Sequence, residues 1–316
     1  MKVAPIPLLF DVTDRVALGE PCQISASLFL PEVLPARPTV VVAVPGGTYT
    51  RAYWHLEVPG RGGYSFAAHL VGAGLAVVAL DNLGTGASTR PRDADQVTFE
   101  TAAAANAEVA AELADRIGSG RLAAGVPARA DVRLVGVGHS LGGQLLAVQQ
   151  AAHRSYERVA VLGSSFLGDD ADGATARLSA MSPETWDGGY LDIPRSHLRP
   201  LFHAPDVPDD VLAADDAGAT VLPRRLGVGA LAPAPYQQLL PDIDVPVLLA
   251  YADVDTSPDP LAELAMYRRS PDVTLVRLAG SAHCHNSSGA RLRLWDRLVR
   301  WISVPERSPA GAPYAP

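Results

Sequence analysis

The residues best suited to chemistry lie in one short segment, Gly138-His139-Ser140-Leu141-Gly142, which has the form G-x-S-x-G. An apolar, β-branched run precedes it and good helix formers follow, which is the setting in which this motif presents a nucleophilic serine. We expect a turn so sharp that a β-carbon at Gly138 or Gly142 would collide with the opposing backbone. The Leu141 N–H, at a helix N-terminus, then faces a developing oxyanion. The alternative, a glycine-rich turn that contains a serine by chance, fits the flanking segments less well.

Buried strands and helices alternate on both sides of this segment. Continuous apolar runs, typical of strands buried on both faces, occupy residues 39–44, 76–80, 158–162, 245–251 and 274–278. Helical segments follow at 64–72, 99–117, 260–269 and 289–302. The alternation predicts βα units and therefore an α/β fold with a mostly parallel sheet. At the N-terminus, residues 8–18 and 23–30 flank a Gly-Glu-Pro turn and predict an antiparallel hairpin at the edge of the sheet.

The regular alternation stops between residues 165 and 241, where the sequence has many prolines and short amphipathic pieces but no buried strand. A bare loop of this length is unusual, so we expect a helical cap inserted over the C-terminal edge of the sheet. Residues 1–164 and 242–304 then form the core, and the Pro-, Ala- and Gly-rich tail at 305–316 is predicted to be disordered. Trp186, Tyr190 and Phe202 of the cap are candidates to cover a substrate.

Composition excludes several kinds of partner. The 316 residues include 26 Lys and Arg against 34 Asp and Glu, a net charge of −8, and no basic cluster. Nucleic acids and anionic membrane surfaces are therefore poor partners. No apolar run approaches the roughly 18 residues that span a bilayer, and no secretory signal is recognised, so stable membrane anchoring is not expected and the cytoplasm is the default. Cys22 and Cys284 lie far apart and do not support a disulfide framework.

Taken together, these segments resemble the α/β-hydrolase superfamily over about residues 5–303, in its serine esterase- and lipase-like branch with a helical cap. The resemblance rests on the elbow serine, a glycine-rich Pro-Gly-Gly-Thr loop at 45–48, a D-x-x-G-x-G turn at 81–86, and an acid followed by a histidine near the C-terminus. It implies a sheet of about eight strands and a Ser–acid–His triad whose members each follow a strand. It implies no cofactor.

Within this resemblance Ser140 is the nucleophile, and a base must take its proton as it attacks. Relatives commonly carry G-x-x-H after the last strand, and Gly280-Ser281-Ala282-His283 has that form, which selects His283. His285, two residues further on, is the alternative. We expect His285 to be a histidine of the pocket rim or a hydrogen-bonded structural one.

The base needs a carboxylate to fix its tautomer. The family pattern G-x-x-D falls on Ala252 to Asp255, with alanine in place of the usual glycine, and selects Asp255 over Asp253. Some relatives carry the acid after the strand that precedes the cap, which would point to Asp169 or Asp170. Otherwise these two aspartates are solvated charges at the start of the cap.

The oxyanion hole needs two N–H donors, for which Leu141 and Gly47 are the candidates. Pro45 stands where relatives often have histidine, but a backbone donor is not abolished by that change. Tyr49, Tyr53 and Trp54 either line the substrate pocket or pack the long loop that contains them.

Other reactive residue types have simpler interpretations. Asp81 is expected to form a turn by bonding nearby amides. Cys284 is a small neighbour of the base in a tight loop. His283 and His285 are the only close histidine pair, and no further residues complete a metal ligand set, so no metal site is expected.

A serine at the elbow excludes the branches of the superfamily that use aspartate there. We therefore expect hydrolysis of a small hydrophobic carboxylic ester, or a lactone, through an acyl-enzyme. A thioesterase, an acyltransferase or a carbon–carbon bond hydrolase would use the same triad. A catalytically silent small-molecule receptor is a further alternative, against which the complete set of three groups argues.

Overall fold

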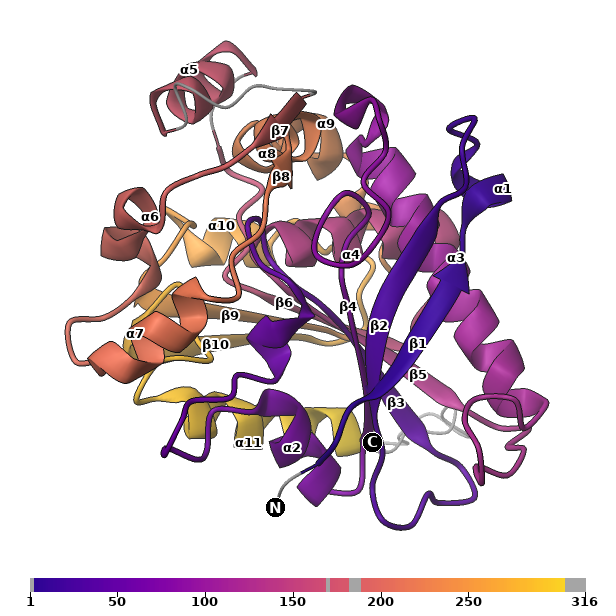
Figure 1. Cartoon of the computed structure of the whole chain (residues 1–316). Helices are drawn as coiled ribbons and strands as arrows, with labels where there is room; N and C mark the ends of the chain where they lie inside the picture. Colours follow the sequence, from indigo (N-terminus) through magenta and orange to yellow (C-terminus); the bar gives the residue numbers. More distant parts are fainter. Residues whose placement is uncertain (1–2, 169–170, 182–188, 305–316) are drawn as a thin grey trace, which may run out of the picture.

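The computed structural model describes residues 3–168, 171–181 and 189–304. Its centre is an eight-stranded sheet with the order β1-β2-β4-β3-β5-β6-β9-β10 (Figure 1). The strands are β1 (Ile6–Asp11), β2 (Gln23–Phe29), β3 (Thr39–Val44), β4 (Ala76–Leu80), β5 (Arg133–His139), β6 (Arg158–Leu162), β9 (Val247–Val254) and β10 (Val273–Ala282). β2 pairs antiparallel with β1 and β4, and all other neighbours are parallel. The predicted α/β-hydrolase architecture, with a mostly parallel sheet of eight strands, is confirmed.

Helices cover both faces of the sheet. The main ones are α2 (Phe66–Gly72), α3 (Phe99–Gly118), α4 (Leu141–His153), α10 (Pro260–Leu264) and α11 (Arg291–Ser303). On β3, Val40, Val42 and Val44 join the hydrophobic cluster that contains α3 and α4, whereas Val41 and Ala43 join the cluster that contains α2 and α11. Every residue of β3 after Thr39 is buried, which is why the strand is a continuous apolar run.

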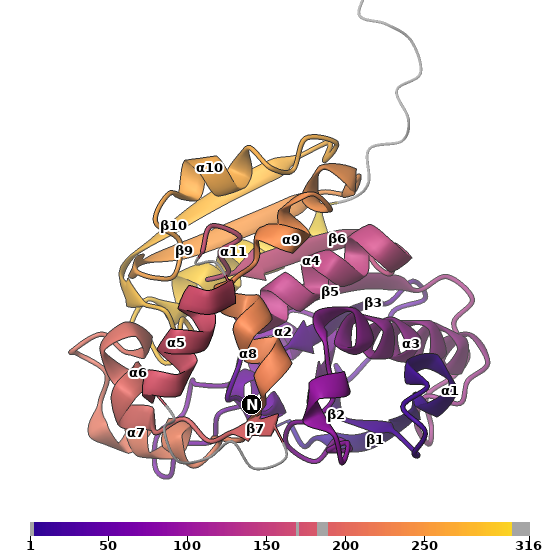
Figure 2. The same cartoon turned by 90° about the horizontal axis from the view of Figure 1, so that it is seen from above.

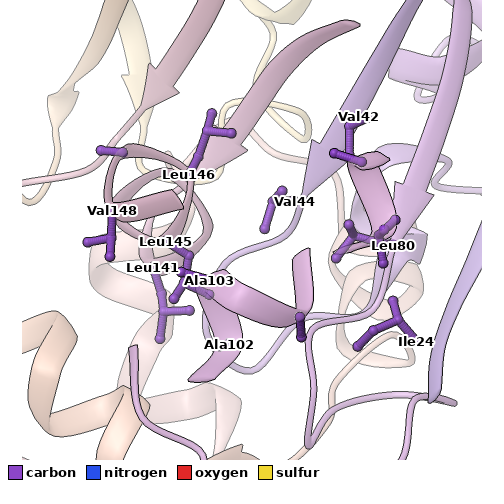
Figure 3. Packing of buried hydrophobic residues seen from close by; sticks show 14 of the residues in the cluster. Ile24, Val42, Val44, Leu80, Ala102, Ala103, Leu141, Leu145, Leu146 and Val148 are labelled. Atoms are coloured by element: carbon purple, nitrogen blue, oxygen red, sulfur yellow. The ribbon is translucent and has the colours of Figure 1, made fainter. Parts of the chain in front are cut away.

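The elbow helix packs closely on its neighbour because small side chains separate them. α3 is rich in alanine, and Ala102 and Ala103 are almost fully buried. Figure 3 shows these two alanines beside Leu141 and Leu145 of α4. The start of α4, and with it the serine that precedes it, is thus anchored in the core.

The predicted strand over 8–18 is wrong beyond residue 11. β1 ends at Asp11, and the next residues form the helical turn α1 (Thr13–Val16). The Asp11 carboxylate accepts the Thr13 N–H at 2.9 Å, and the Thr13 hydroxyl accepts the Cys22 N–H at 2.9 Å. These local bonds give the backbone an alternative to the ladder, and Ala17, at φ 50°, ends the turn.

The chain between β6 and β9 lies outside the eight-stranded sheet. It forms α5 (Ala171–Met181), α6 (Arg195–Phe202), α7 (Asp209–Asp216), α8 (Arg224–Leu231) and α9 (Ala234–Gln237). Contrary to the expectation of no buried strand, β7 (Tyr190–Leu191) and β8 (Leu222–Pro223) make a short antiparallel pair in which three of the four residues are buried. α5, α6 and α7 lie together on the side of the molecule opposite α1 (Figures 1 and 2). The division into core and cap stays a prediction.

Trp186, Asp169, Asp170 and the tail at 305–316 lie outside the described residues. Both cysteines are free and buried. Among the helices that the structure describes, none is long and apolar enough to cross a membrane.

Candidate active site

Ser140 occupies a strained turn between β5 and α4. Its φ of 54° and ψ of −128° lie outside the regions that side chains ordinarily adopt. The neighbouring chain segments approach closely. A β-carbon on Gly138 would lie 2.6 Å from Gly143 Cα, and one on Gly142 would lie 2.8 Å from the Pro45 carbonyl carbon. Only glycine fits at either position, as the motif predicts, and the turn presents the serine at the carboxyl end of the sheet.

Asp255 and His283 meet at the same edge of the sheet. Asp255 follows β9, His283 follows β10, and the His283 Nδ1 lies 2.7 Å from the Asp255 Oδ1. Both side chains are almost fully buried, at 1% exposure for the histidine and 3% for the aspartate. Burial alone would raise the pKa of Asp255, but its hydrogen bonds to His283 and His285 outweigh burial and hold the pKa well below its ordinary value. The carboxylate is therefore ionised.

The backbone of the loop that carries His283, after β10, is held by two other elements. His139, the last residue of β5, bonds through Nε2 to the His283 carbonyl oxygen at 2.7 Å. Burial, helped by the nearby His283 and His285, holds the pKa of His139 well below its ordinary value, so it acts as a neutral donor. The His283 N–H donates to the Leu201 oxygen at 3.2 Å, and the Cys284 N–H donates to the Phe202 oxygen at 2.8 Å, both at the end of α6. The sequence pattern predicted neither connection.

Gly163 borders the Asp255–His283 pair and was also missed. It follows β6 with a φ of 58°, and a β-carbon there would lie 3.0 Å from Asp255 Oδ1 and 3.1 Å from His283 Nδ1. The available signal was a glycine placed directly after a predicted strand, next in the sheet to the strand that carries the acid.

The two residues that carry the candidate oxyanion donors are neighbours in the structure. A β-carbon on Gly47 would contact Leu141 Cδ1 at 3.6 Å. Neither the Gly47 nor the Leu141 amide donates a hydrogen bond to an acceptor within the described residues. As the first residue of α4, Leu141 has no partner inside the helix. Both N–H groups are therefore available to a ligand.

Arg195, from the start of α6, holds the loop that carries Gly47. Its Nη1 donates to Thr48 Oγ1 at 3.1 Å and its Nη2 to the Thr48 carbonyl oxygen at 3.0 Å. Thr48 has a φ of 64°, a strained conformation that needs such support. The guanidinium also lies 4.1 Å from the centre of the Tyr49 ring. No sequence signal separated Arg195 from the other arginines.

A cavity of about 250 Å³ opens at Ser140 and Asp255. Its wall is partly polar, with Gln144, Ser164, Ser165 and Thr256, and partly apolar, with Leu167, Leu201, Ala230 and Leu231. Gln144 joins the core to the segment between β6 and β9, because its Nε2 donates to the Ser165 oxygen at 2.6 Å and to the Ala230 oxygen at 2.9 Å.

The five described aromatic candidates, Tyr49, Tyr53, Trp54, Tyr190 and Phe202, are not among the residues that line this cavity. Tyr49 is buried, and its hydroxyl donates to Asp215 at 2.7 Å. Phe202 stacks on Tyr49 with 5.7 Å between ring centres. Trp54 is fully buried beside Phe66, and the Tyr190 hydroxyl donates to the Pro91 oxygen at 2.9 Å. For Tyr49 and Trp54 the structure thus shows the packing alternative, and their role in binding substrate stays a prediction.

Asp253 and Asp81, the two other aspartates considered in the sequence analysis, have different partners from Asp255. The Asp253 carboxylate accepts the Gly280 N–H at 2.7 Å and makes no contact with either histidine of the loop among the hydrogen bonds of the described chain. The fully buried Asp81 accepts the Ala87 N–H at 2.8 Å within its own turn, as expected. It also accepts the Arg51 N–H at 2.6 Å and pairs with the Arg51 guanidinium, which the sequence did not predict.

Solved structures with the same fold include several hydrolases. A soluble variant of monoglyceride lipase from Saccharomyces cerevisiae has 14% identity and a TM-score of 0.66, over 96% of this chain and 95% of that chain. An esterase from Thermogutta terrifontis has 16% identity and a TM-score of 0.65, over 96% and 98%. An enol-lactonase from Burkholderia xenovorans LB400 has 16% identity and a TM-score of 0.63, over 89% and 96%. At these identities the likeness shows the fold alone.

A search of curated proteins finds no match to the sequence. The family model described as "Alpha/beta hydrolase family" matches residues 41–293, which contain the turn at Ser140, the candidate oxyanion residue Gly47, Asp255 and His283. This range is most of the chain and includes the sheet from β3 onward, apart from the first two residues of β3; β1 and β2 precede it. The chain belongs to the alpha/beta hydrolase family.

Proposed function

We propose that this protein is a serine hydrolase that cleaves a small carboxylic ester or lactone through an acyl-enzyme. The observation that carries the proposal is the buried 2.7 Å hydrogen bond between His283 Nδ1 and Asp255 Oδ1, at the cavity that Ser140 lines. An aspartate that holds Nδ1–H leaves Nε2 of the imidazole bare, as a general base requires.

The reaction then follows from the positions of these groups. Ser140 Oγ attacks the ester carbonyl carbon while His283 Nε2 takes its proton. The tetrahedral oxyanion accepts hydrogen bonds from the Gly47 and Leu141 amides. As the intermediate collapses, the imidazolium gives its proton to the leaving alkoxide, and the acyl group stays on Ser140. Water repeats the sequence, with His283 as base, and releases the acid.

His285 is a poorer candidate for the base although it also contacts Asp255. Its Nε2 lies 3.0 Å from Asp255 Oδ2, and its Nδ1 is buried with no hydrogen-bond partner in the described chain. The acid therefore occupies the nitrogen that would face a serine.

The cavity supports a small substrate. Its volume of about 250 Å³ lies below the range of roughly 300–1,000 Å³ that holds drug-sized ligands. Leu167, Leu201, Ala230 and Leu231 supply an apolar wall from the segment between β6 and β9. We propose that this segment acts as the cap and selects a short hydrophobic acyl group or a lactone ring.

The test is covalent labelling followed by a substrate panel. A fluorophosphonate should label the protein once, and peptide mapping should place the label on Ser140. Ser140→Ala should abolish labelling and lower kcat by about 10⁴-fold or more, since the triad acts as a unit. Ser119→Ala is the matched control, because Ser119 is an exposed serine bonded to the Asp115 carbonyl.

The panel contains p-nitrophenyl esters of increasing chain length, with lactones alongside. We expect kcat/KM to be highest for the short esters or the lactones. A label on another serine, or no label on a folded sample, would refute the serine-hydrolase proposal. A preference for long acyl chains would refute the small-substrate part alone.

A further inference from the structure

Asp255 serves two histidines at once. Its Oδ1 accepts the Thr256 N–H at 2.8 Å and the His283 Nδ1–H at 2.7 Å. Its Oδ2 accepts the Ala252 N–H at 2.8 Å and the His285 Nε2–H at 3.0 Å. A mechanism that orients one base uses only the Oδ1 side of this carboxylate. His285, the second histidine, has no role in the proposed reaction.

The contacts of His285 fix which of its ring nitrogens bonds to the acid. Because Asp255 is an ionised acceptor, the Nε2 of His285 carries a proton. The Nδ1 is buried and has no partner within the described residues, so a proton there would be an unsatisfied buried donor. His285 therefore donates one hydrogen bond to the carboxylate, through Nε2, and its Nδ1 makes none within the described residues.

The ionisable groups around His285 come from several elements. The ring of His139, at the end of β5, lies 5.5 Å from that of His285, and burial keeps it neutral. Tyr53 stacks on His139 with 4.6 Å between ring centres, and burial raises the pKa of Tyr53. Cys284, between the two histidines, has its pKa raised by burial as well. The charge that faces His285 directly is that of Asp255.

We propose that His285 is a positioning residue that, through Asp255, lowers the proton affinity of His283. The inference rests on the proposed function, in which His283 is the base. A carboxylate stabilises the imidazolium of its partner less strongly when a further donor shares its negative charge. His285 therefore keeps His283 unprotonated, and the enzyme active, at a lower pH than a single histidine would allow. It also fixes the carboxylate plane by holding Oδ2.

Two substitutions separate this role from packing. His285→Leu removes the donor to Oδ2. His285→Gln keeps an amide donor at about the reach of Nε2 without an imidazole. His69→Leu and His69→Gln are matched controls, because His69 bonds to Asp296 at 2.9 Å through Nε2 on the exposed surface.

The measurement is the second-order rate constant for fluorophosphonate labelling of Ser140 between pH 4.5 and 9, which needs no knowledge of the natural substrate. For His285→Leu we expect the acid limb to move up by about half to one pH unit, a 3- to 10-fold slower labelling below the limb. For His285→Gln we expect the limb to return toward that of the wild type. The His69 variants should keep the wild-type profile.

Each outcome decides something. An unmoved acid limb in His285→Leu, with a lower plateau alone, would mean that His285 only packs the loop and would overturn the inference. Equal shifts in the Leu and Gln variants would also overturn it, since the donor would not matter. If His285→Leu does not fold, His285→Asn replaces it, because its shorter amide cannot reach Oδ2. An unshifted acid limb in His285→Asn would then overturn the inference. Failure of the wild type to label at Ser140 refutes the proposed function itself.

Discussion

The most direct test of the spacing between Asp255 and His283 is the substitution Gly163→Ala. The added methyl group would lie 3.0 Å from Asp255 Oδ1 and 3.1 Å from His283 Nδ1, closer than nine in ten real β-carbon contacts. One of the two side chains must then move by a few tenths of an ångström. Since neither atom ends a flexible chain, the displacement falls on the hydrogen bond between them.

Gly163→Ala combines a loss of stability from backbone strain with a loss of rate from the displaced side chains, and a control variant separates the two. At a φ of 58° alanine is strained by about 1–2 kcal/mol, which lowers stability without touching the site. Gly19 has a φ of 77° and nothing within 4 Å of an added β-carbon, so Gly19→Ala has the strain alone. A misplacement of about 1 Å costs roughly 100-fold in rate, so a few tenths should lower kcat by about 10-fold.

The assay compares kcat on a short p-nitrophenyl ester with thermal unfolding for both variants. Both should lose similar stability, of the order of 1–2 kcal/mol, while only Gly163→Ala loses turnover. If Gly163→Ala keeps kcat within about twofold of Gly19→Ala, then the Asp255–His283 spacing does not limit the reaction and the reasoning fails.

Three further predictions concern the acid, the oxyanion loop and a buried carboxyl. Asp255→Asn should lower kcat by about 10⁴-fold through the wrong histidine tautomer, and Asp253→Asn far less; reversed effects in steady-state kinetics would place the acid at Asp253. Arg195→Ala should lower kcat by about 10- to 100-fold with little change in KM in steady-state kinetics, because Thr48 loses both of its bonds to the guanidinium. Arg195→Lys should not restore kcat, since one ammonium group cannot make both bonds in the same geometry. Burial raises the pKa of Glu263 above 4.5, so the folded state binds more protons and the free energy of unfolding should fall as pH rises from 4.5 through the raised pKa; urea denaturation between pH 4 and 8 should show a flatter profile for Glu263→Gln.

The strands whose first and last residues were predicted correctly share one physical property. β3, β4 and β6 are buried on both faces, so each is an uninterrupted apolar run with clear ends. The edge strand β1 lacks this property. Val12 and residues 16–18 are apolar, so the sequence shows no clear end to the strand, whereas in the structure Thr13 bonds to Asp11 and Cys22 and begins a helical turn.

The candidate site divides in the same way. The turn at Ser140 is marked in the sequence by its own glycines: Gly138 is needed for the close approach of Gly143, although Gly142 is needed for that of the distant Pro45. Asp255 and His283 follow strands and were placed by the family pattern, and the structure brings them into contact, while their roles remain predictions. Arg195 is 147 residues from Thr48 in the chain, and no local pattern encodes a contact of that range.

The bonds from the loop after β10 to the end of α6 limit how this protein could be redesigned. Because the N–H groups of His283 and Cys284 donate to the carbonyl oxygens of Leu201 and Phe202, the segment between β6 and β9 completes the backbone support of the histidine loop. Grafting a foreign segment there to change specificity would remove two acceptors along with the old pocket wall. A transplant that preserves these two carbonyls should keep turnover, whereas one designed only to reshape the cavity should lose it for every substrate alike.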